Sequence, residues 1–293
     1  MMRESIFKLK EGRSLSYAIF GRPEHRPVLY FHGTPSSRLE PMLINSFGGD
    51  LDRLLDEAGL QLIAVDRPGM AFSTFNPAGN FLSFANDVLQ LMQAIGLDHC
   101  PVLCWSGGGP YALAAAHQLP QHIESVHIIC GFTRTFGPDV TSQMGMNRWY
   151  FYLARNSAFF LRSAMNVISH KKTTVSPPRR ITGLPHEDYR LIQNPMMLEE
   201  LSKHTLKQAT RFGSRGAVYE ANNYYRDFGF SLENIHQPIH YWWGTKDMTV
   251  IRLHPEALES RAPHPVMHYR EGEGHLSLYI HCFKEILQTV ASS

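Results

Sequence analysis

The hydrophobic pattern of the chain alternates between short apolar runs and longer stretches with helical spacing. Residues 5–10 and 15–20 flank the polar turn Glu11-Gly12-Arg13, which predicts a β-hairpin. Further short apolar runs end in Gly- or Pro-containing loops and predict strands at 27–32, 60–65, 102–105, 123–130, 238–244 and 265–269. Apolar residues recur with helical spacing at 51–58, 81–95, 112–117, 255–261 and 276–290. This alternation predicts an α/β fold with a mostly parallel, eight-stranded sheet flanked by helices.

The alternation stops at about residue 133. Residues 133–234 are rich in Met, aromatic and Arg side chains, with helical spacing at 149–168 and 187–210. A loop is expected at 171–183, because two prolines there block a helix. Strands resume at 238, so the block interrupts one sheet. We therefore expect a helical cap at 133–234, inserted after the sixth strand into an α/β core made of residues 1–132 and 235–293.

Composition and charge exclude several classes of protein. The chain is 43% hydrophobic and 18% charged, which is globular, and its formal net charge of +2 gives no reason to expect nucleic acid. No apolar run reaches the roughly 18 residues of a membrane span, and the N-terminus lacks the apolar core of a signal peptide. The four cysteines form no CxxC pair, so we expect buried reduced thiols rather than a zinc site or disulfides. These features together predict a cytoplasmic protein.

The stretch from Val102 to Ala112 carries the strongest chemical signal. An apolar run ends at Ser106, three glycines follow, and a small-residue helix begins at Ala112. A strand, a sharp turn and a helix in this order place the hydroxyl at the apex of the turn. The helix dipole and the free N–H groups there favour any negative charge that develops. This is the arrangement of a nucleophile elbow, and Ser106 is the predicted nucleophile.

A serine hydroxyl becomes a good nucleophile only when a base takes its proton and a third group holds that base. Among 16 histidines, His275 follows a strand and a glycine-containing turn and opens the last helix, so it is the predicted base. Asp247, just past the 238–244 strand, is the predicted orienting carboxylate, with a helix N-cap as its alternative role. Asp139 is the fallback acid, and Glu273 lies too near His275 in sequence to be preferred.

Acyl transfer also needs N–H donors for the oxyanion of the tetrahedral intermediate. The N–H of Gly107, directly after the nucleophile, is one candidate. The second is expected in the loop His32-Gly33-Thr34-Pro35, where Thr34 is the candidate, because Gly33 permits a close backbone approach and Pro35 has no N–H.

Taken together, these residues resemble the α/β-hydrolase fold superfamily, in the esterase and proline iminopeptidase-like branch with an inserted cap. The chain order Ser106, Asp247, His275 is the order of that family's triad. The resemblance covers nearly the whole chain, including the loops His32-Gly33-Thr34-Pro35 and Asp66-Arg67-Pro68-Gly69. The chain departs from the family pattern at Cys104, where the elbow usually has Gly, and at Ala71, in a loop that we expect to be structural.

The resemblance implies a cofactor-independent serine hydrolase without a metal, which cleaves an ester or related acyl bond of a small, largely apolar substrate. It is expected to be a monomer or homodimer. Ser106 argues against epoxide hydrolases and haloalkane dehalogenases, which use an aspartate at the elbow. The alternatives are a proline iminopeptidase-like aminopeptidase, a carbon–carbon bond hydrolase, a thioesterase, an acyltransferase, or a non-catalytic ligand-binding protein on this fold.

Aromatic and charged residues of the predicted cap give two further hypotheses. Trp105, Trp149, Phe151 and Phe160 are candidates for an apolar substrate pocket, although such aromatics also pack between a cap and its core. The block 133–234 has 14 basic and 8 acidic residues, a net charge of +6. This charge favours an anionic substrate, and the alternative is that these residues only form solvent-exposed helix faces. An aminopeptidase would need carboxylates to bind a free amine, and the candidates are Glu199, Glu200 and Glu220.

Overall fold

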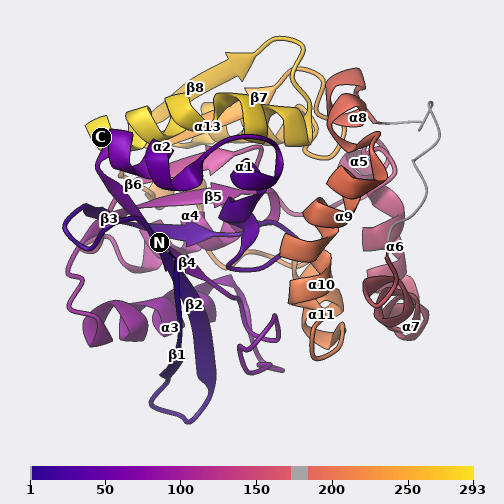
Figure 1. The fold of residues 1–293 in the computed structure, drawn as a ribbon, viewed down its shortest axis with the longest axis horizontal. Helices are drawn as coiled ribbons and strands as arrows, with labels where there is room; N and C mark the ends of the chain where they lie inside the picture. The colour runs from indigo at the N-terminus through magenta and orange to yellow at the C-terminus, as the bar shows by residue number, and fades with distance from the viewer. Residues whose placement is uncertain (1, 173–183) are drawn as a thin grey trace.

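A computed structural model describes residues 2–172 and 184–293, with a twisted eight-stranded sheet at its centre (Figure 1). The strands are β1 (Arg3–Lys8), β2 (Ser14–Phe20), β3 (Arg26–Phe31), β4 (Leu60–Val65), β5 (Cys100–Trp105), β6 (Ile123–Ile129), β7 (Ile239–Gly244) and β8 (Pro265–Arg270). They lie in the order β1-β2-β4-β3-β5-β6-β7-β8. Only the β1–β2 and β2–β4 pairs are antiparallel. The predicted mostly parallel sheet of eight strands is confirmed.

Helices cover both faces of this sheet (Figure 1). Helices α3 (Phe81–Ala94) and α4 (Gly109–Gln118) pack together on one face, and α2 (Leu51–Ala58) packs with α13 (His275–Ser292) on the other. The short α1 (Leu43–Ser46) contacts α13, and α12 (Leu253–Arg261) packs on β8. Because helices cover both faces, β4 and β5 are buried at every residue, which explains their unbroken apolar sequences.

Local sequence signals set the ends of the core helices. The side chain of Asp50 accepts a hydrogen bond from the Arg53 N–H at the start of α2, which ends at Gly59 in the left-handed region (φ +65°). Asn80 caps α3 in the same way by accepting from the Ser83 N–H. The four cysteines are buried free thiols. Within residues 2–172 and 184–293, no helix combines the length and apolar character needed to cross a membrane.

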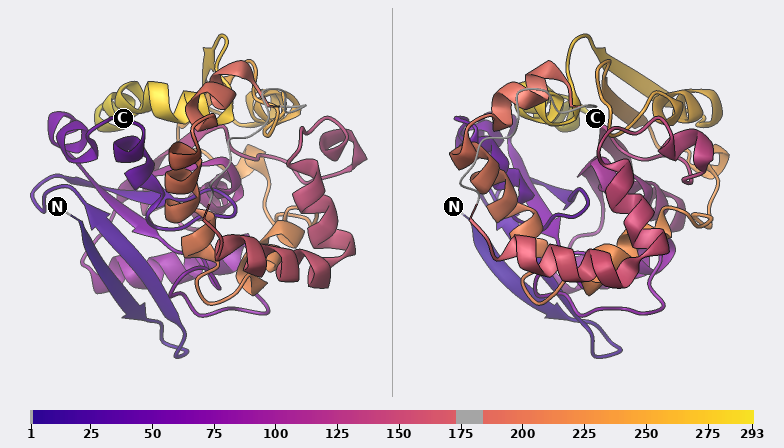
Figure 2. Two further views of the ribbon diagram at one scale, coloured as in Figure 1. Left: turned by 45° about the vertical axis from the view of Figure 1, so that its right-hand side comes forward. Right: turned by 90° about the vertical axis from the view of Figure 1, so that its right-hand side faces the viewer.

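Between β6 and β7 the chain forms a group of helices on one side of the molecule, arranged in an arc (Figure 2). They are α5 (Pro138–Thr141), α6 (Arg148–Asn156), α7 (Ala158–Ser169), α8 (His186–Ile192), α9 (Pro195–His204), α10 (Leu206–Ala209) and α11 (Arg215–Asn223). Residues 133–234 are called the insertion below.

The insertion is more broken than its periodicity predicts. The helical stretch expected at 149–168 is interrupted at Ser157, and the one at 187–210 is interrupted before Pro195 and again at Thr205. Pro195 starts a new helix because it lacks the N–H that would continue the preceding one, and Asn194 caps it. Most of the loop expected at 171–183 lies outside the described residues.

Candidate active site

Ser106 lies in a sharp turn between β5 and α4. Its backbone is in the left-handed region (φ +54°), an uncommon conformation for a residue with a side chain. The turn has room only because glycines follow: a Cβ on Gly108 would lie 2.4 Å from the Phe31 carbonyl oxygen, and one on Gly109 2.5 Å from that of Phe132. This close packing accounts for the glycine run and directs Ser106 toward the loops at the carboxyl ends of the strands.

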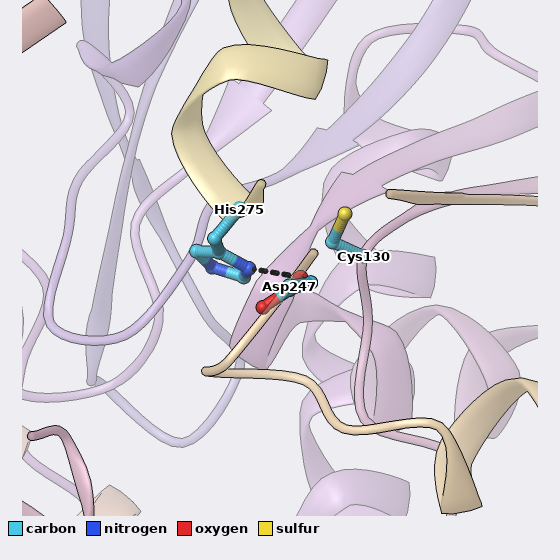
Figure 3. Close-up of side chains that lie close together, drawn as sticks. All are labelled: Cys130, Asp247 and His275. Atoms are coloured by element: carbon cyan, nitrogen blue, oxygen red, sulfur yellow. Dashed lines mark hydrogen bonds and ion pairs between the residues drawn. The ribbon is translucent and has the colours of Figure 1, made fainter. Parts of the chain in front are cut away.

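The structure brings Ser106, His275 and Asp247 together from the segments that follow three different strands. Ser106 Oγ lies 2.9 Å from His275 Nε2, and His275 Nδ1 lies 2.7 Å from Asp247 Oδ2 (Figure 3 shows the second contact). Both distances are those of hydrogen bonds. With the proton on Nδ1 donated to Asp247, Nε2 is left to accept the serine proton, which is the arrangement an activated serine needs.

Asp247 is held from its other side by backbone and by a thiol. Its Oδ1 accepts hydrogen bonds from the N–H groups of Thr249 (2.7 Å) and Val250 (2.8 Å) in a turn. The next helix, α12, begins only at Leu253, so Asp247 does not have the helix-capping role considered above. Cys130 Sγ, Asp247 and His275 Nδ1 lie within 4.8 Å of one another (Figure 3). Burial, together with the Asp247 carboxylate, raises the pKa of the Cys130 thiol well above its usual value, so Cys130 remains a neutral S–H beside the carboxylate.

Electrostatics favour the protonated form of His275. Burial by itself would lower the pKa of the imidazole, but the carboxylates of Asp247, Asp188 and Glu40 together outweigh burial, and the net pKa is raised above its ordinary value. The ring also stacks on Trp105, with centroids 5.1 Å apart. Trp105, a predicted substrate-binding residue, is thus largely buried between His275 and Tyr279.

Thr34 and Gly107, the two predicted oxyanion donors, are neighbours. A Cβ on Gly107 would lie 2.2 Å from Thr34 Oγ1, so only glycine fits beside this threonine. The N–H of Gly33 is already used, because both carboxyl oxygens of Glu40 accept it at 2.8 and 2.9 Å. The N–H of Thr34, the next residue, remains the predicted second donor.

Glu40 is a buried site residue that the sequence pattern did not indicate. Besides the Gly33 N–H, it accepts a hydrogen bond from the Tyr30 hydroxyl at 2.7 Å. Burial raises its pKa to about 7. No local sequence pattern marks Glu40 as a site residue, because its partners come from a strand and a loop that only the fold places beside it.

Comparison with protein-family models matches residues 26–281 to the alpha/beta hydrolase fold family. The chain belongs to that family. The resemblance inferred from the sequence is therefore confirmed at this level, and the chain is an enzyme of the hydrolase class.

Solved structures resemble this hydrolase over its whole length. A hydrolase from Pseudomonas aeruginosa PA01 has a TM-score of 0.71 at 17% identity, covering 99% of this chain and 98% of that one. The esterase RhEst1 from Rhodococcus sp. ECU1013 has a TM-score of 0.68 at 19% identity (100% and 98% covered). The esterase EaEST from Exiguobacterium antarcticum has a TM-score of 0.67 at 17% identity, covering 99% of this chain and 99% of that one. At such identities the likeness shows the fold. No curated protein sequence matches the hydrolase.

The insertion of the hydrolase is joined to the active-site loops by a buried polar network. Arg67, in the loop after β4, makes an ion pair with Glu220 of α11 and also donates to the carbonyl oxygens of His32 and Gly33. Glu220 and the Tyr224 hydroxyl both bond with Thr34 Oγ1, and the Tyr224 hydroxyl donates to the Gly107 carbonyl oxygen at 2.9 Å. The insertion therefore contacts both loops that carry the predicted oxyanion donors.

The remaining candidate carboxylates are paired elsewhere. Glu220 is neutralised by Arg67, Glu199 pairs with Lys207, and Glu200 lies 3.4 Å from Lys203 Nζ. Asp139, the fallback acid, pairs with Arg134 on the surface, and Glu273 pairs with His281. The structure thus places Asp247 at His275, and the other predicted acids away from it.

The aromatic residues predicted to line an apolar pocket lie in different surroundings. Trp149 and Phe160 are 56% and 71% exposed on the outside of α6 and α7. Phe151 is buried, but its ring packs against Phe132, Phe136 and Tyr224, between the insertion and the core. Helical spacing shows which aromatics share a face, but it does not show which face meets the core. A substrate-lining role for Trp149 and Phe160 therefore stays a prediction.

Proposed function

We propose that the protein is a cofactor-independent serine hydrolase that cleaves an ester or related acyl bond of a small, largely apolar substrate through an acyl-enzyme. The observation that carries this proposal is the hydrogen-bonded chain Ser106–His275–Asp247, with contacts of 2.9 and 2.7 Å. The esterase activity named for two similar structures supports the choice of an ester bond.

In this mechanism His275 Nε2 takes the proton of Ser106 as Oγ bonds to the substrate carbonyl carbon. Asp247 stabilises the imidazolium that forms. The N–H groups of Gly107 and Thr34 bind the tetrahedral oxyanion, and loss of one such donor typically costs about 100- to 1000-fold in turnover. The C–O bond to the leaving alcohol then breaks as His275 returns the proton to that oxygen. Water, activated by His275, hydrolyses the acyl-enzyme and frees Ser106.

We further propose that the insertion acts as a cap that shapes the substrate site. The support for this role is its contact with the oxyanion loops through Glu220 and Tyr224. An aminopeptidase is less well supported. It would need a carboxylate to bind the free amine of its substrate, and Glu220, the cap carboxylate that contacts the oxyanion loop, already neutralises Arg67.

The test is hydrolysis of short p-nitrophenyl esters, together with labelling by a fluorophosphonate probe. Ser106→Ala should abolish both. Ser163→Ala, an exposed serine on α7, is the matched control and should retain both. Labelling that persists in Ser106→Ala would overturn the assignment. Aminoacyl arylamides, thioesters and carbon–carbon bond substrates in the same panel distinguish the alternative reactions. Tight binding of a small molecule without turnover on any substrate would favour the ligand-binding alternative.

A further inference from the structure

Asp188, on helix α8 of the insertion, binds the first turn of α13. Its carboxylate accepts hydrogen bonds from three consecutive backbone N–H groups, those of His275 (2.8 Å), Leu276 (3.1 Å) and Ser277 (2.8 Å). The first N–H groups of any helix have no partner within the helix and need an acceptor from outside. Here that acceptor comes from a segment 87 residues earlier in the chain.

The residue before α13 is built to admit this carboxylate. Gly274, at the N-cap position, has no side chain that could cap the helix. A Cβ on Gly274 would lie 2.5 Å from both carboxyl oxygens of Asp188, so any other residue would displace them. The absence of a side chain at Gly274 thus leaves the space that Asp188 occupies.

We propose that Asp188 is a positioning residue for His275: it fixes the first turn of α13, and with it the imidazole, at hydrogen-bond distance from Ser106 and Asp247. The inference rests on the proposed serine-hydrolase function for its catalytic consequence. Because Asp188 lies on α8 of the insertion and His275 is a member of the triad, the contact between them couples the placement of the insertion to the geometry of the triad.

Asp188 also contributes charge at the imidazole. Burial raises the pKa of Asp188 above its usual value, and the backbone N–H donors, together with the positive end of the helix dipole, oppose this by favouring the carboxylate form. Within the part of the chain that the structure describes, the ionisable groups that face His275 are the carboxyls of Asp247, Asp188 and Glu40 and the thiol of Cys130. Since the Asp188 carboxylate is among the groups that raise the pKa of His275, removal of its charge should lower that pKa.

The experiment compares Asp188→Asn, Asp188→Ala and the control Glu187→Gln. Glu187 is the preceding residue on the same helix and carries the same charge, but it pairs only with surface His186 and Arg190 among the described residues. Asp188→Ala should lower kcat on a p-nitrophenyl ester by roughly 100-fold with little change in KM, as expected when a reacting group is misplaced by about 1 Å. Asp188→Asn keeps an oxygen acceptor but loses the charge, so the acid limb of its kcat/KM profile should move to lower pH. Glu187→Gln should match the wild type in both measurements.

A readout that needs no turnover separates this inference from the proposed function. In protein labelled with ¹³C-histidine, the His275 signal is assigned with His275→Gln and titrated by NMR in wild type and Asp188→Asn. A lower midpoint in Asp188→Asn supports the inference even if no ester is hydrolysed. The inference would be overturned if Asp188→Asn kept the wild-type midpoint, kcat and pH profile and differed from the wild type only in lower stability. If Asp188→Ala does not fold, Asp188→Asn and Asp188→Glu carry the comparison, and the longer glutamate side chain should restore the midpoint but not the full kcat.

Discussion

Arg67 and Glu220 form a buried ion pair that joins the loop after β4 to helix α11, 153 residues later in the chain. The pair also touches Thr34, through Arg67 Nη2 at 3.0 Å and through Glu220. A buried charge is tolerated only while its partner and its hydrogen bonds are in place. This contact therefore fixes the insertion on the core at the predicted oxyanion loop.

Removing one member of this pair should be costly. Arg67→Ala leaves Glu220 buried without its partner, so the free energy of unfolding should fall by about 3–5 kcal/mol, measured by urea denaturation. The double variant Arg67→Met with Glu220→Leu buries no charge and should recover most of that loss. A double variant as unstable as Arg67→Ala would show that the loss does not come from the unpaired charge of Glu220.

The Tyr224 hydroxyl should support the loops that carry Thr34 and Gly107. Tyr224→Phe removes a donor to the Gly107 carbonyl oxygen and a 2.6 Å contact to Thr34 Oγ1. We expect a loss of about 1 kcal/mol in stability and a lower kcat with little change in KM. Tyr225→Phe is the control, because the ring of this neighbouring residue stacks on Arg155 and its hydroxyl bonds to no group among the described residues. Equal kinetic effects from both variants would contradict this role.

Two phenylalanines of the insertion should differ sharply in their contribution to stability. Phe151→Ala empties a buried aromatic cluster and should cost about 3–5 kcal/mol. Phe160→Ala changes an exposed side chain and should stay within about 0.5 kcal/mol. Thermal unfolding of each variant measures the change in stability, and KM for a p-nitrophenyl ester measures any effect on substrate binding. A large rise in KM for Phe160→Ala, without a change in stability, would support the prediction that this residue lines the substrate site.

Buried histidines should make the protein less stable in acid. Burial lowers the pKa of His254 to about 3, from about 6.5 for a free histidine. The unfolded chain therefore binds this proton first, and the stability that is full above pH 6.5 declines as the pH falls toward 3. His254→Gln does not titrate, so its free energy of unfolding should depend less steeply on pH between 6.5 and 4.5. Urea denaturation across this range is the measurement, with values at pH 8 as the baseline, and an unchanged slope would contradict the assignment.

Local sequence patterns located the core elements and the chemistry of the site. The apolar run ending at Ser106 and its glycines predicted the elbow, because a sharp turn leaves a local signature of small residues. Asp247 and His275 could be chosen because strand ends in a parallel sheet meet at one edge, and in the structure His275 lies between Ser106 and Asp247.

What the sequence by itself determined is the order of strands and helices, the α/β architecture and the residue types at the strand ends, since each depends on neighbours within a few positions. Only the tertiary structure decided the partners that lie far apart in sequence. Asp188 on the first turn of α13, Arg67 with Glu220, and Glu40 on the Gly33 N–H are such contacts. It also decided that Phe160 faces outward, because periodicity defines the faces of a helix but the packing of the whole chain selects the one that is buried.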